Sequence, residues 1–233
     1  MPSPEQLRSY AEVVITVGLG LEPNDRVLIE IPTALPELAH DLVEVSYQGG
    51  AEDVEVVWID TAVDRARFAH GPVAATKTVS QRSHSKALSF ESGVSYLRVL
   101  AEDPAGMSGM DPDRIGDFTR ANNEVVFAAR ERQMVGEVPW TVISAPVPDW
   151  TTSVFPDVDL EEATERLWSA ILRACRIVVA MSHCATEVRA PTSRSDSLTN
   201  LSGKVAPSRH RAGRGSVPTF LPKRSTPHLI CRR

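Results

Sequence analysis

The chain has 233 residues and a formal net charge of −5, with 42% hydrophobic and 24% charged residues. This length suits one large domain, or a domain of about 150 to 200 residues with an appendage. No stretch approaches the roughly 20 apolar residues of a membrane span, and the N-terminus has no signal-peptide pattern. We therefore expect a cytoplasmic protein without membrane contact.

The first expected helix begins at Ser3, which with Gln6 three residues later forms the start pattern of a capping box. Apolar residues then recur at helical spacing as far as Gly18 and Gly20, which we expect to end the helix. The apolar, partly β-branched run at 26–31 that follows predicts a buried strand.

A second helix is expected from Leu35 to the Gly49-Gly50 pair, because apolar residues again recur at helical spacing. The run at 54–59 predicts a second strand, which ends at Asp60. From 61 to 92 the periodicity is weak, and we expect helix in parts of this stretch.

The third expected strand covers 94–101, and a helix opens at Asp111-Pro112. The fourth strand covers 140–145 and is closed by the prolines that follow it. A last helix runs from about Asp159 to Arg176. Helices that alternate with short apolar strands predict an α/β fold, with a mainly parallel sheet covered on both faces.

The charge balance changes sign after this last helix. Residues 1–176 carry 28 acidic and 15 basic side chains, whereas residues 177–233 carry 2 acidic and 10 basic ones. The second segment is rich in Ser, Thr, Pro and Arg, a composition typical of disorder. We expect an amino-terminal α/β domain at 1–176 and a disordered basic tail at 177–233.

Acidic residues follow two of the predicted strands. Ligand sites of open α/β sheets lie beyond the carboxyl ends of the strands, which singles out Asp60 and the pair Glu102-Asp103. Such carboxylates bind cations or move protons, but they also cap the next helix, and we favour the capping interpretation. Gly18 and Gly20 precede a strand instead of following one, so they do not form a dinucleotide fingerprint.

Two further patterns are interpreted as chance. Ser83-His84-Ser85-Lys86 satisfies the S-x-x-K pattern of penicillin-recognising enzymes, but the chain has no K-T-G sequence. Several residues near the C-terminus are of the zinc-ligand type without zinc-site spacing; they are His183, Cys184, His210, His228 and Cys231. With Cys175, the cysteine count is three, so a disulfide framework is not expected.

Five blocks of sequence between Leu7 and about Ile177 resemble one known family. They are YAEVVITVGLGLEPNDRVLIEIP, GAEDVEVVWID, YLRVLAEDP, VGEVPWTVISAPVPDW with the nearby VFPD, and ERLWSAILRACRI. In order and approximate spacing they resemble the amino-terminal domain of the aminopeptidase T family, also called aminopeptidase S or thermophilic aminopeptidase. The resemblance covers about three quarters of the chain.

The resemblance implies a metal-dependent exopeptidase that removes N-terminal residues from peptides. In this family the amino-terminal domain is a scaffold, and two divalent metal ions, such as zinc or cobalt, are held in a larger carboxyl-terminal domain. Because that domain is not found in these residues, we expect an inactive fragment with no catalytic and no metal-binding residue. The resemblance also implies a homodimer. Nucleic-acid binding is not expected.

A frameshift accounts for the basic tail. Residues 215–227 can be read in codons made from the last base of each residue and the first two bases of the next. This shifted frame is compatible with Phe-Cys-Ala-Asn, an apolar residue and Pro-Thr-Glu-Glu-Val-Tyr-Thr, which resembles a segment found further along in family members. We therefore hypothesise that the reading frame is lost just after the ERLWSAILRACRI block.

Two other interpretations remain open. In the first, the chain is an interaction module whose basic arm binds nucleic acid or an acidic partner. In the second, it is a small-molecule enzyme with its site near Asp60 and Glu102. The arm has a single aromatic residue, Phe220, on which a base could stack, so it would bind nucleic acid without specificity.

Overall fold

The computed structural model describes residues 1–101, 103 and 105–177. Predictions that concern Glu102 or residues 178–233, which include almost all of the tail, lie outside the described residues. Of the helices described, none is long and apolar enough to span a membrane.

The centre of the described part is a four-stranded parallel sheet, as the sequence predicts. Its strands follow the order β2-β1-β3-β4 across the sheet, and every neighbouring pair is parallel. Their bounds are β1 (Arg26–Pro32), β2 (Asp53–Ile59), β3 (Ser95–Leu100) and β4 (Trp140–Ser144). Strands β1 and β3 are therefore central, and β2 and β4 form the edges.

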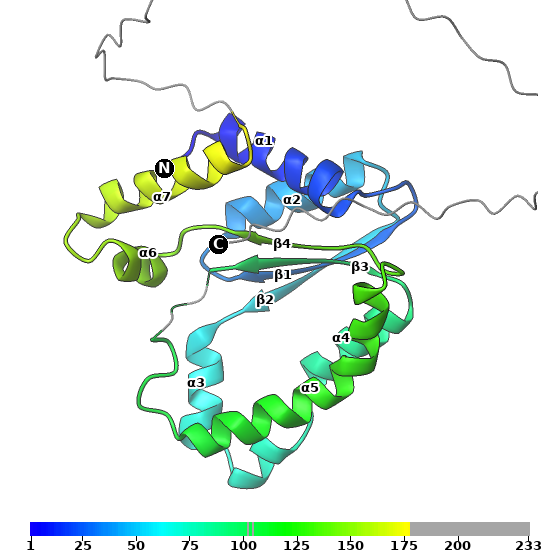
Figure 1. Ribbon diagram of the computed structural model, residues 1–233, viewed down its shortest axis with the longest axis vertical. Coiled ribbons are helices and arrows are strands. Elements are labelled where there is room, and N and C mark those ends of the chain that lie inside the picture. The colour runs from blue at the N-terminus through cyan, green and yellow to red at the C-terminus, as the bar shows by residue number, and fades with distance from the viewer. Residues whose placement is uncertain (102, 104, 178–233) are drawn as a thin grey trace, which may run out of the picture. The chain divides into compact units, whose positions relative to one another are not determined.

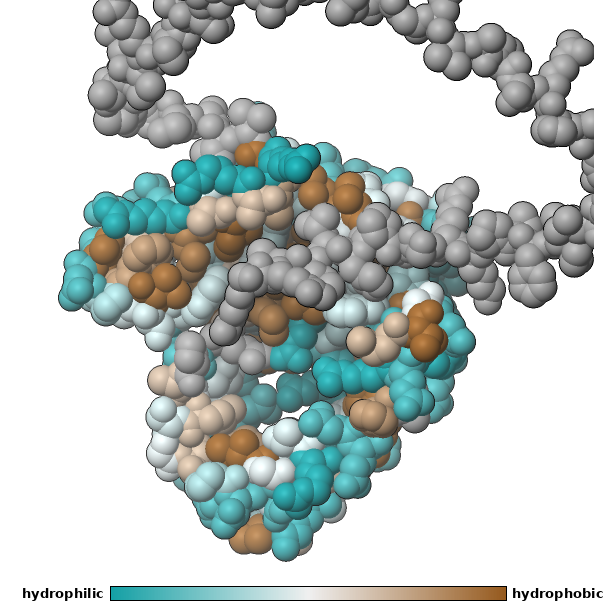
Figure 2. Space-filling model, in the orientation of Figure 1, coloured by the Kyte–Doolittle hydropathy of each residue, from teal (hydrophilic) through white to brown (hydrophobic). Residues whose placement is uncertain are grey.

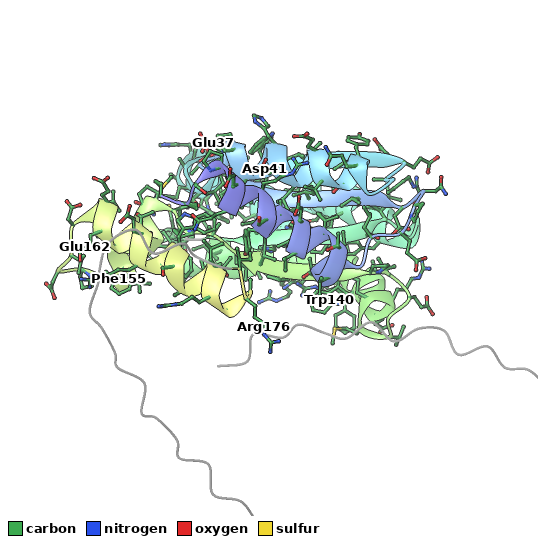
Figure 3. All side chains as sticks on the ribbon, turned by 90° about the horizontal axis from the view of Figure 1, so that it is seen from above. Glu37, Asp41, Trp140, Phe155, Glu162 and Arg176 are labelled. Carbon is green, nitrogen blue, oxygen red and sulfur yellow. The ribbon has the colours of Figure 1, made fainter. Side chains whose placement is uncertain are left out.

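Helices cover both faces of this sheet, which confirms the predicted architecture. One face carries α1 (Pro4–Val13), which continues as the π-helical segment η1 (Val14–Leu19), together with α2 (Pro36–Gln48) and α7 (Leu160–Ala174). The other side carries α3 (Thr61–His70), the 3₁₀ segment η2 (Val73–Lys77), α4 (Gln81–Glu91) and α5 (Pro112–Met134) (Figure 1). Figure 3 looks onto the first face, where α7 extends from near Glu162 to near Arg176 alongside α1.

Side chains of the central strands alternate between the two faces. Val27, Ile29 and Ile31 of β1 are at most 1% exposed and lie in the larger apolar cluster with α1, α2 and α7. Leu28 points to the opposite face, where it joins Phe90 of α4 in a smaller cluster. Because β1 is buried on both faces, its buried residues 27–31 do not alternate between apolar and polar, and Glu30 is the one charged residue among them.

Contacts from α1 fix the helices of the first face. The hydroxyl of buried Tyr10 donates to the carbonyl of Ser144 at the end of β4, at 2.8 Å. Its ring meets the Trp168 ring of α7 edge-on, with the centroids 5.8 Å apart. One aromatic residue thus joins the first helix, the last helix and an edge strand.

The predicted start of the first helix is confirmed, and its end is corrected. Ser3 and Gln6 form a complete capping box. Gly20, with a φ of 68°, ends the helical segment in the left-handed conformation that favours glycine. Gly18 does not end it: it lies inside η1, where a Cβ would approach Oγ1 of Thr141 to 3.3 Å. Gly18 is thus a packing glycine and not a helix stop.

A short helix after β4 is absent from the sequence prediction. The prolines there were expected only to close the strand, but Pro148 occupies the first turn of α6 (Pro148–Val154). Proline is compatible with the first turn of a helix, because the N–H that it lacks has no helical partner there. The weakly periodic stretch 61–92 contains α3, η2 and α4.

Replacing Ile29 by Ala in the middle of β1 should lower the free energy of unfolding by about 2 to 5 kcal/mol, since the side chain is fully buried and its removal leaves a cavity. Val63→Ala is the control, because Val63 is 61% exposed on α3, and it should change the value by less than about 0.5 kcal/mol. Urea denaturation followed by circular dichroism measures both. Equal losses in the two variants would contradict the assignment of the core.

Candidate functional site

A charged hollow lies between the sheet and helices α3, α4 and α5. Its volume is about 450 Å³, and Figure 2 shows hydrophilic residues on its walls. Six ionisable side chains line it: Glu30, Asp64, Arg82, Lys86, Arg98 and Arg130. A hollow of this size is in the usual range for small-molecule sites.

The order of the strands explains where the hollow forms. Helix α2, which follows β1, packs on one face of the sheet, whereas α5, which follows β3, lies on the other. The chain therefore winds in opposite directions from β1 and β3, and such a switch point is where open α/β sheets bind ligands. Glu30 and Arg98 are register partners on these two strands.

Glu30 is the most buried charge of the hollow, at 4% exposure. Its Oε2 atom accepts hydrogen bonds from Lys86 Nζ at 2.9 Å and from the Tyr96 hydroxyl at 2.5 Å. Lys86 Nζ also lies 2.5 Å from the Tyr96 hydroxyl oxygen and 4.3 Å from the centre of its ring. A buried carboxylate is costly unless it is paired and hydrogen-bonded, and this cluster satisfies both conditions.

The surroundings shift the ionisation of all three groups. Burial raises the pKa of Glu30, but the charge of Lys86 and the hydrogen bonds from Tyr96 and Lys86 outweigh it, so the pKa lies below its usual value. Burial lowers the pKa of Lys86, and the charges of Arg98 and Arg130 add to this effect against the attraction of Glu30. Burial and the charge of Glu30 raise the pKa of Tyr96, which keeps its proton.

A second ion pair and a hydroxyl network border the same hollow. Arg82 of α4 pairs with Asp64 of α3 at 3.2 Å. Ser80, the N-cap of α4, donates from its backbone N–H to Asn122 Oδ1 of α5 at 2.9 Å, and its hydroxyl lies 2.7 Å from the same oxygen. These contacts join the three helices that form the outer wall.

The carboxylates proposed from the strand ends are not in this hollow. Asp60 is the N-cap of α3 and accepts hydrogen bonds from the N–H groups of Ala62 and Val63. Asp103 accepts from the N–H of Ala105 in the following turn. Glu102 lies outside the described residues. Asp60 therefore caps a helix, as the sequence analysis favours, and Asp103 forms a turn.

Two residues of the S-x-x-K tetrapeptide line the hollow, but they are not arranged as a nucleophile and its base. Ser83 and Lys86 line the wall, while His84 and Ser85 are exposed. Lys86 bonds to Glu30 and Tyr96, and the Ser83 hydroxyl lies 3.0 Å from that of Ser80. The lysine therefore neutralises a buried carboxylate.

The described residues do not fit a metal site. Among them, no three or more His, Cys, Asp or Glu side chains gather closely enough to hold an ion. The histidines and cysteines at 183–231 lie outside the part of the chain that the structure describes.

The sequence analysis does not identify Glu30 and Arg98 of the hollow, although a signal for them is present. Glu30 and Arg98 are single charges inside runs of apolar residues, RVLIEIP and SYLRVL. A charge within a strand buried on both faces needs a partner or a ligand, because isolated buried charges are rare. Their shared register and their link to Lys86 required the tertiary structure.

The fold is an open parallel α/β domain with a charged hollow on one face of its sheet. Residues 3–185 match the sequence model of the thermophilic metalloprotease (M29) family. The chain belongs to this family, and the resemblance noted in the sequence is confirmed.

Named relatives and a solved structure agree with this membership. Aminopeptidase T of Thermus thermophilus is 32% identical over 171 residues, and aminopeptidase PepS of Streptococcus thermophilus is 31% identical over 175. The structure of wild-type AmpT from Thermus thermophilus superposes with a TM-score of 0.68 at 30% identity, covering 73% of this chain and 43% of that one. The matches cover 73% or 74% of this chain and 42% of each curated relative.

Replacing Glu30 by Gln should flatten the acid dependence of stability. A carboxyl group whose pKa is lower in the folded than in the unfolded state contributes stability above its unfolded pKa, and the contribution disappears as the pH falls through the folded pKa. The wild type should therefore lose more free energy of unfolding than Glu30→Gln as the pH drops from about 5 to about 3. Urea titrations at each pH measure this.

Glu55→Gln, on the exposed side of edge strand β2, controls for the loss of one carboxylate. If Glu30→Gln and wild type showed the same slope with pH, the pairing of Glu30 would not contribute to stability.

Proposed function

We propose that this chain is the amino-terminal, scaffolding part of a metallo-aminopeptidase, the class of enzyme that removes N-terminal residues from peptides. The observation that carries this proposal is the match of residues 3–185 to the M29 family, with 31% and 32% identity to two named aminopeptidases over nearly the same region. In this proposal the domain organisation is an α/β scaffold at 1–176 followed by a segment at 177–233 with no peptidase role.

We propose that the metal centre of a full-length aminopeptidase of this family lies outside the matched region. The chain spans 42% or 43% of the length of the curated relatives it matches, and its described residues offer no metal-holding group. Two divalent ions, zinc or cobalt, would then be bound by the part of the relatives that has no counterpart here. Homodimer formation and a cytoplasmic location belong to the same proposal.

The purified 233-residue protein should not hydrolyse leucyl-p-nitroanilide above background, with cobalt or zinc ions added, because no three His, Cys, Asp or Glu side chains of its described residues gather closely enough to hold an ion. The release of p-nitroaniline is followed by absorbance. Aminopeptidase T of Thermus thermophilus, assayed in the same buffer, is the positive control. Hydrolysis that depends on added metal and is abolished by a chelator would overturn the proposal of an inactive scaffold.

We further propose that residues 177–233 are translated from a shifted reading frame. The excess of basic residues and the codon compatibility of residues 215–227 with a family-like segment support this. Sequencing of the gene across codons 170–230 is expected to show a shifted frame that spells this segment. A shifted frame that lacks it, or that closes before codon 233, would contradict the proposal.

The alternative of an interaction module with a basic arm rests entirely on residues 177–233. Because almost all of these residues lie outside the described part of the chain, no structural observation favours it. Deleting residues 177–233 tests it, since nucleic-acid binding through such an arm would depend steeply on salt and would disappear with the deletion.

A further inference from the structure

Strand β2 leaves one edge of the sheet open within the described part of the chain, where it pairs with β1 alone. Val54 donates its N–H to the Tyr47 hydroxyl of α2 at 3.2 Å, so its backbone groups point away from β1. Backbone groups two residues apart in a strand point the same way, so those of Val56 and Trp58 also point away from β1. They form a row of donors and acceptors with which a further strand can pair.

A shallow apolar groove lies beside this open edge. It has a volume of about 550 Å³ and is lined by α2 and by Val56 and Trp58 of β2. Val56 is the register partner of Ile29, and both Val56 and Val43 of α2 pack against the larger apolar cluster. Two aromatic side chains of the lining remain exposed, Tyr47 at 48% and Trp58 at 42%. An exposed apolar patch with polar surroundings is typical of an interaction surface.

The other face of the same strand is acidic. Asp53 and Glu55 alternate with the valines of β2, and Glu52 directly precedes the strand; all three carboxylates are exposed. Among the described residues, Arg26 is the register partner of Asp53, but its guanidinium donates to the carbonyl of Ser92. The edge therefore combines an apolar groove on one face with negative charge on the other.

We propose that the β2 edge and its groove bind an extended segment of another protein in which apolar and basic residues alternate. Paired with β2, this segment forms backbone hydrogen bonds and places its apolar side chains in the groove beside Trp58. Its basic side chains then lie on the other face, beside Asp53 and Glu55. The surface goes beyond the scaffold role, because no step of peptide cleavage uses it.

Charge favours a basic partner over a second copy of this chain. Pairing two β2 edges would bring two sets of exposed carboxylates, Glu52, Asp53 and Glu55 of each copy, into one interface, where they would repel. Charges on an edge strand prevent unwanted pairing, and acidic ones exclude acidic partners while they attract basic ones.

Fluorescence anisotropy of a labelled peptide mixed with the full chain tests the surface. The probe is a blocked heptapeptide of alternating lysine and valine, and two comparison peptides carry glutamate in place of lysine or proline in place of the central valine. We expect saturable binding of the lysine peptide, at least about 10-fold tighter than that of either comparison peptide. Glutamate reverses the charge complementarity, and proline removes a backbone N–H and interrupts the strand.

Trp58→Ala is the principal variant, because it removes an aromatic wall of the groove and Trp58 is not part of either buried cluster. It should weaken binding of the lysine peptide about 10-fold. Phe127→Ala is the matched control: it removes an aromatic side chain that is 64% exposed on α5, and it should leave binding unchanged. Far-UV circular dichroism verifies that both variants are folded.

A charge reversal tests the acidic face separately. Glu55→Lys should weaken binding of the lysine peptide about 5-fold and strengthen binding of the glutamate peptide, because the new charge attracts the opposite partner. Glu131→Lys makes the same exchange at an exposed position of α5 and should change neither affinity.

Four results would overturn the proposal. They are the absence of saturable binding at about 1 mM lysine peptide, equal affinities for the lysine and glutamate peptides, equal losses in Trp58→Ala and Phe127→Ala, and a dimer of the full chain that Trp58→Ala dissociates in sedimentation equilibrium. The last result would mean that a second copy occupies the edge. Because binding to the wild type is measured directly, a variant that fails to fold does not alter the outcome.

Discussion

The burial of strand β1 on both faces is the constraint on which the rest of the structure depends. With β2 on one side and β3 on the other, β1 is paired along both edges, and its residues 27–31 are buried. Its odd-numbered residues Val27, Ile29 and Ile31 require the apolar cover that α1, α2 and α7 provide. Its even-numbered residues require a different cover, because one of them is Glu30.

A carboxylate at that position determines what can pack against the second face. Near the amino end of the sheet, Leu28 and Tyr96 pack with Phe90 in an apolar cluster. Two residues further along β1, Glu30 requires Lys86 and the Tyr96 hydroxyl, and the helices stand apart around a charged hollow. Removing Lys86 would leave Glu30 as a buried charge without its counter-charge, a much larger cost than the modest net value of the ion pair itself.

Much of the architecture could be predicted from local pattern. The apolar runs at 26–31 and 54–59 correspond to β1 and β2 within one residue, and the capping box at Ser3 and the expected helix start at Asp111-Pro112 are present. The errors have local causes as well: Pro148 suits a helix start as well as a strand end, and Gly18 lies inside η1, where a Cβ would make a tight contact with the Thr141 side chain. The hollow could not be predicted, because Glu30 and Lys86 are 56 residues apart in the chain.

The sequence by itself determined the α/β class, the positions of the strands and the membership in a metallopeptidase family, because these depend on side-chain period and on blocks of residues read in order. The tertiary structure decided which charged residues meet. Asp60, at a promising strand end, is a helix cap, whereas Glu30 and Arg98, hidden inside apolar strands, become neighbours at the switch point of the sheet. Pairing across a sheet is set by register and by the packing of distant helices, and neither is written in the local sequence around any one of these residues.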